Sequence, residues 1–174
     1  MLSVLAIGAG FAGCGGSSSS GKTPEAYVKA VCQAIIPFQT DVKAKSSALN
    51  VSNLTSPAAG KTALEGFMSA VVADTEQAVN KLKAAGTPNI SNGKTISTAI
   101  VNAFNQLKTA LQQAQSQTNN LPTNSAAAFK AAAQTLGTSI QTSVGAIGAS
   151  LNGLKSPELE KAAKSVPECK PLGG

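Results

Sequence analysis

The feature that most constrains the fold is a helical spacing of apolar residues that repeats over almost the whole chain after residue 23. Apolar side chains recur every three or four residues in four long segments, which places them on one face of an α-helix. Short breaks rich in proline, glycine and asparagine separate these segments. The pattern predicts an all-α protein with no sheet.

Local signals mark the predicted helix ends. Thr23 followed by Pro24 is typical of a helix start, and Gly86 is expected to end the second helix in a left-handed conformation. Pro37 falls inside the first helix and should kink it near Gln33. The predicted helices span about 24–49, 57–85, 91–118 and 124–151, and a short fifth helix opens at Ser156-Pro157-Glu158.

Short connections between long helices favour antiparallel neighbours, so the expected architecture is an up-down four-helix bundle with a short fifth C-terminal helix. One phenylalanine falls in each long helix. A rise of about 1.5 Å per residue puts three of them at one height and Phe104 a turn or two below. These four phenylalanines form either a packed core layer, as apolar stripes usually do, or the wall of a ligand pocket. Its members are Phe38, Phe67, Phe104 and Phe129.

The composition excludes several kinds of chemistry. The 174 residues contain 14 Lys, no His and no Trp, and no Arg occurs in the sequence. The commonest general base and metal ligand are therefore missing, and the scattered lysines with few aromatics do not suggest nucleic-acid binding. No catalytic constellation, metal site or cofactor motif emerges, because acidic neighbours such as Asp74 and Glu76 point in different directions on a helix.

One motif suggests an enzyme by letter alone. Residues 16–23, GSSSSGKT, match the phosphate-binding loop of nucleotide hydrolases. That loop joins a strand to a helix whose first turn already contains the Lys and Thr. Here Pro24 disfavours a helical Thr23, and no strand is predicted nearby. A chance match in a flexible Ser/Gly stretch is the preferred interpretation, and a phosphate-loop enzyme is the remote alternative.

The first residues have the composition of an export signal. Residues 2–11, LSVLAIGAGF, are apolar but too short for a permanent membrane span, and Ala12 and Gly13 precede Cys14. This order resembles the lipobox of small secreted bacterial lipoproteins of actinobacterial type. The resemblance implies a signal peptide over 1–13, acylation of Cys14, a tether over 14–23 and a helical domain over 24–174. It also implies export and a lipid anchor on the outer face of the cell membrane.

With Cys14 assigned to lipid, two cysteines remain. Cys32 lies in the first helix and Cys169 in the tail after the fifth. Outside the cytoplasm such a pair is expected to form a disulfide. A redox or metal pair is disfavoured because there is no C-x-x-C spacing and no histidine.

A final compositional shift concerns possible partners. Between Thr95 and Leu154 the only charged residues are Lys108 and Lys130. The fourth predicted helix also holds three glycines that allow either close backbone approach or a mobile helix end: Gly137, Gly145 and Gly148. This uncharged face is either the ordinary weakly charged surface of an exported domain, which is the preferred interpretation, or a site for an envelope protein or cell-wall glycan. The leading hypothesis is a non-catalytic envelope lipoprotein, and the alternative is a carrier of a small apolar ligand near the phenylalanines.

Overall fold

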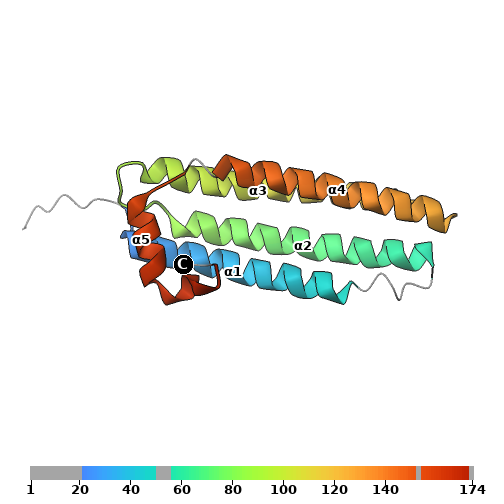
Figure 1. Cartoon of the computed structure of the whole chain (residues 1–174), viewed down its shortest axis with the longest axis horizontal. Helices are drawn as coiled ribbons and strands as arrows, with labels where there is room; N and C mark the ends of the chain where they lie inside the picture. Colours follow the sequence, from blue (N-terminus) through green and yellow to red (C-terminus); the bar gives the residue numbers. More distant parts are fainter. Residues whose placement is uncertain (1–20, 50–55, 152–153, 173–174) are drawn as a thin grey trace, which may run out of the picture.

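The computed structural model describes residues 21–49, 56–151 and 154–172. Four long helices run along one axis in alternating directions: α1 (Pro24–Ala48), α2 (Pro57–Ala85), α3 (Gly93–Thr118) and α4 (Ala126–Leu151). A short helix, α5 (Pro157–Ser165), and a 3-10 helix, η2 (Pro167–Leu172), lie across the start of α1 (Figure 1). No strand occurs in these described ranges, so the predicted all-α bundle with a short C-terminal helix is confirmed.

The predicted helix starts are confirmed in atomic detail. The hydroxyl of Thr23 accepts a hydrogen bond from the backbone N–H of Ala26 at 3.2 Å, before α1. Ser56 and Ser156 accept equivalent bonds before α2 and α5, and a proline follows each of the three caps. These side chains satisfy N–H groups that have no partner inside the helix, which is why the sequence locates the starts so well.

Two starts lie later than expected. The helix α3 begins at Gly93 instead of residue 91, because a turn precedes it in which the N–H of Gly93 donates to Ile90 at 3.1 Å. A Cβ at Gly93 would overlap the carbonyl oxygen of Pro88, so this turn requires glycine. The helix α4 begins at Ala126, two residues later than predicted, after Ser125 accepts a hydrogen bond from Ala128.

Two further local predictions concern α1 and α2. Gly86 ends α2 with a φ of 74°, the sole positive φ among the described residues. Pro37 lies inside α1, yet the helix continues to Ala48. Pro37 and Gln33 are both exposed, so water can solvate the Gln33 carbonyl that loses its N–H partner.

The long helices pack in chain order, α1 on α2, α2 on α3, and α3 on α4. The helices α1 and α4, whose contact would close a four-helix ring, are not among the packed pairs of the described residues. In Figure 1, α1 lies at one edge, α2 in the middle, and α3 with α4 at the other edge. The bundle is therefore open along the side between α4 and α1.

We call one end of the bundle the hairpin end. It holds the starts of α1 and α3, the end of α2, and the connection 86–92 between α2 and α3 (Figure 1). One hydrophobic cluster lies there and joins α1 to the tail, and a second cluster joins α2, α3 and α4 further along. The second cluster consists of Met68, Val71, Leu111, Ala114 and Leu136.

Candidate interaction surface

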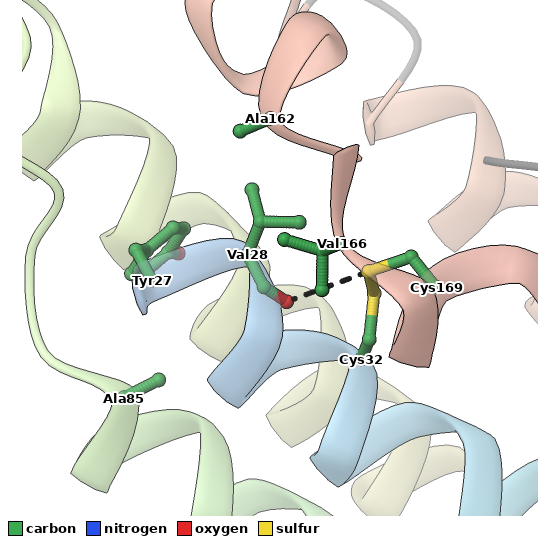
Figure 2. Packing of buried hydrophobic residues seen from close by; sticks show 7 residues of the cluster. All are labelled: Tyr27, Val28, Cys32, Ala85, Ala162, Val166 and Cys169. Carbon is green, nitrogen blue, oxygen red and sulfur yellow. Dashed lines mark hydrogen bonds between the residues drawn. A yellow bond between two sulfur atoms is a disulfide. The ribbon is translucent and has the colours of Figure 1, made fainter. Parts of the chain in front are cut away.

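The C-terminal tail is bound covalently to α1. The Sγ atoms of Cys32 and Cys169 lie 2.00 Å apart, with Cα atoms 5.3 Å apart, so the structure contains the disulfide that the sequence predicts. Both cysteines are buried. Figure 2 also marks a contact of 3.8 Å between the Cys169 sulfur and the Val28 carbonyl oxygen, which is a packing contact because a disulfide sulfur carries no proton.

Apolar packing and one ion pair support this disulfide. Ala162 and Val166 of the tail lie over Val28 in Figure 2, and all three are buried in the first cluster. On the surface, the ammonium of Lys29 lies 2.6 Å from the carboxylate of Glu168. The hydrogen bond from Lys29 lowers the pKa of Glu168, because it stabilises the charged carboxylate.

The same cluster buries the one tyrosine of the chain. Tyr27 is 3% exposed, and its burial raises the pKa of the phenol to about 12. A phenol held neutral in this way cannot serve as a base near neutral pH. The hairpin end of α1 is therefore a packing site in which Tyr27 is buried.

The structure describes residues 21–23 of the phosphate-loop match, and these residues contact other parts of the protein. The backbone of Lys22 pairs with the α2–α3 connection, donating to Thr87 at 2.9 Å and accepting from Asn89 at 2.7 Å. Its ammonium donates to the carbonyl of Ala84 at 3.3 Å, near the end of α2. Gly21 lies against Asn89, with only about 3.0 Å of room for a Cβ. Residues 16–20 and Cys14 lie outside the described residues.

The predicted position of Phe104, a turn or two below the other phenylalanines, is wrong. Phe38 and Phe104 form an edge-to-face pair with ring centroids 5.8 Å apart, although Phe104 was expected to lie below the layer. Phe67 packs on the second cluster, whereas Phe129 belongs to neither cluster.

One phenylalanine borders a surface hollow. Phe67 lies there with Gly66 of α2 and with Ala48 and Leu49 at the end of α1. Lys45 also lines the hollow, and its ammonium donates to Asp74 at 2.6 Å, which raises the pKa of Lys45. The hollow is open to solvent and does not join the four phenylalanines into one pocket.

The helix α4 presents the most uncovered apolar surface. Leu136, 5% exposed, is the one buried residue of its inward stripe; Phe129, Ala133 and Ile140 are half-buried, and Val144 is 47% exposed. The helix packs mainly on α3 and has one fully buried side chain over 26 residues. The inward stripe of α4 is therefore buried at Leu136 and uncovered around Val144.

The glycines of this helix face open space. A Cβ built at Gly137, Gly145 or Gly148 would meet nothing within 4 Å apart from the helix itself. The expectation that they allow a close backbone approach within the domain is therefore wrong. Lys130 is the one charged residue on α4, so the surface around the glycines has small side chains and almost no charge. Sequence patterning missed the exposure because the same stripe would be buried in a closed bundle.

Neither a candidate metal cluster nor a candidate membrane span is found among the described residues. The described residues contain no group of three or more His, Cys, Asp or Glu side chains that could hold a metal ion. Within those ranges no helix combines the length and hydropathy that crossing a bilayer requires. Comparison of the chain with protein families, curated proteins and solved structures finds no match in any of the three.

Proposed function

We propose that this protein is a lipid-anchored lipoprotein of the bacterial cell envelope that acts as a non-catalytic interaction module through α4. The observation that carries the proposal is the uncovered, uncharged face of α4, with Val144 at its centre. Val144 is a large apolar side chain left exposed on a helix with almost no charge, and exposed apolar surface bordered by polar residues marks sites that a partner covers.

The anchor is proposed from the leader. The small residues before Cys14 and the Ser/Gly run after it have the order of a lipobox and a tether. The first described residue, Gly21, lies at the hairpin end, so residues 14–20 would connect that end to lipid. Seven extended residues span at most about 25 Å, which keeps the bundle close to the membrane surface.

An apolar protein surface fits α4 better than glycan does. Glycan recognition relies on free hydrogen-bond donors, and the threonine hydroxyls of α4 donate to carbonyls of their own helix, which leaves the helix fewer of them. Thr135 donates to Ala131 at 3.1 Å, and Thr142 donates to Thr138 at 3.0 Å. The proposed partner is therefore a helix or apolar patch of an envelope protein, and the small glycines of α4 would let it approach closely.

Mass spectrometry and site-specific crosslinking test the two halves of this proposal. Protein extracted from its own membrane in mild detergent should have a mass that begins at Cys14 with a diacylglyceryl group. A photo-crosslinking residue at Gly145 should capture one defined partner, whereas the same residue at Thr109, exposed on α3, should not. An unmodified chain beginning at Met1 refutes the anchor, and equal crosslinking at both positions refutes the α4 interface.

A second candidate function is transport of a small apolar ligand, favoured by the hollow beside Phe67. In the same extract, native mass spectrometry would show a bound ligand as additional non-covalent mass. Gly66→Phe should remove that mass by filling the hollow, since a side chain at Gly66 meets open space. An extract without additional mass counts against the carrier function.

A further inference from the structure

The charge of the molecule is concentrated at one end. The whole chain carries 14 Lys and 8 acidic residues, a formal charge of +6. The hairpin end with the tail, residues 21–29, 81–95 and 154–172, holds nine of these lysines and four glutamates. The rest of the bundle, residues 30–80 and 96–151, holds five lysines and four acidic residues. The balance is therefore +5 at the hairpin end and +1 elsewhere.

The lysines of the two regions also differ in pairing. Away from the hairpin end, Lys45, Lys61 and Lys108 form ion pairs with carboxylates. At the hairpin end only Lys29 does so among the described residues. Eight exposed lysines there have no ion pair within the described part of the chain, and one of them, Lys22, donates to a backbone carbonyl. The other seven are Lys81, Lys83, Lys94, Lys155, Lys161, Lys164 and Lys170.

The acidic residues of the hairpin end do not cancel this charge. Glu168 is paired with Lys29, and Glu158 accepts a hydrogen bond from Ser156 at 2.8 Å. Omitting η2 removes one lysine and one glutamate, so the balance stays at +5. The end of α2, the start of α3 and the segment from Lys155 through α5 supply +4 of this excess, and residues 21–29 supply +1. These segments lie together at one end in Figure 1.

We propose that this basic hairpin end is a docking surface for a bilayer of anionic phospholipids. The chain outside the described residues supports this occupant, because residues 1–20 join the bundle at Gly21, at the same end. Unpaired lysines on the membrane-facing end attract anionic headgroups, so the bundle stands on the bilayer with its hairpin end down. This orientation rests on the proposed anchor, but the lipid affinity of the end does not require acylation.

A vesicle-binding assay tests the surface separately from the anchor. The full chain carrying Cys14→Ser cannot be acylated, so its sedimentation with vesicles measures surface binding alone. Vesicles of phosphatidylcholine with 30% phosphatidylglycerol should bind more protein than pure phosphatidylcholine vesicles, which report any uptake of the apolar leader. The difference should disappear in 0.5 M NaCl, where the Debye length falls well below its value of about 10 Å at 0.1 M.

Matched charge variants locate the effect. Lysines near anionic membranes each raise the partition coefficient by about fivefold. The variant Lys81→Gln/Lys83→Gln/Lys94→Gln should therefore bind anionic vesicles about a hundredfold less well. The control variant Lys43→Gln/Lys108→Gln/Lys130→Gln carries the same net charge, but its changes lie away from the hairpin end. Its binding to anionic vesicles should fall by less than fivefold.

Three results would overturn the proposal: equal losses in both variants, equal binding to neutral and anionic vesicles, or binding that resists salt. Lys161→Gln/Lys164→Gln on α5 is the second variant in case the first does not fold. Its binding to anionic vesicles should be about twentyfold weaker than that of the parent. Failure here leaves acylation at Cys14 untouched, because the mass measurement tests that separately. Conversely, a protein without acyl groups that binds anionic vesicles would retain the docking surface and lose the anchor.

Discussion

The tail and α4 each pack on one long helix, but they are held in different ways. The tail, α5 with η2, is short and lies on α1 through a disulfide, an ion pair and the buried residues Ala162, Val166 and Cys169. The helix α4 is 26 residues long and packs on α3 with one fully buried side chain. Length alone therefore does not produce burial. A covalent link holds the short element, whereas the long one keeps an open face.

Removing the disulfide is expected to have the largest effect. The double variant Cys32→Ser/Cys169→Ser should lower the free energy of unfolding by about 2–5 kcal/mol, because it releases a loop closed over 137 residues in the unfolded chain. Urea denaturation measures the loss. Cys14→Ser is the matched control and should leave the midpoint unchanged. A double variant as stable as the parent would show that packing holds the tail without the disulfide.

Truncations along α4 test whether its inward stripe is buried at Leu136 and uncovered around Val144. Leu136→Ala should cost about 2–4 kcal/mol, because it empties a buried position in the second cluster. Val144→Ala, two turns further along the same stripe, should change stability by less than about 0.5 kcal/mol. Thermal and urea unfolding of both variants give the comparison. Similar costs at both positions would mean that the C-terminal half of α4 is covered in solution.

Replacing the glycines of α4 should have a smaller effect on stability, and in the opposite direction. Gly137→Ala, Gly145→Ala and Gly148→Ala should each stabilise the protein by about 0.5–1 kcal/mol, since alanine favours the helix and meets no neighbour. Gly93→Ala should destabilise it, because the new Cβ would overlap Pro88. Melting temperatures distinguish the two cases. A loss of stability at Gly145 would indicate that another surface already packs on α4.

The ion pair of the tail should give the smallest effect, and it depends on pH. Lys29 lowers the pKa of Glu168 below the ordinary 4.5, so the pair contributes stability above that pH. The contribution is lost as the pH falls below about 4.5 through the lowered pKa of the folded state. Glu168→Gln should reduce the acid-induced drop in melting temperature, whereas Glu160→Gln on the exposed face of α5 should not. Identical acid profiles for parent and Glu168→Gln would contradict this role.

The sequence by itself determined the local elements of this protein. The caps Thr23 and Ser156, each followed by proline, located the starts of α1 and α5. Gly86 located the end of α2. These signals act through hydrogen bonds and dihedral angles within a few residues, so the surrounding fold does not change them. The disulfide followed from counting cysteines once one was assigned to lipid.

Only the tertiary structure decided how the helices lie against one another. Three features depend on the path of each connection and on the rotation of each helix about its axis. They are the pairing of Phe38 with Phe104, the bridge from Lys22 to Pro88 and the open side between α4 and α1. The same apolar stripe is buried at Leu136 and exposed at Val144 because α3 alone cannot cover both sides of α4. Periodicity tells which face of a helix is apolar, but the position of its neighbours determines whether that face is covered.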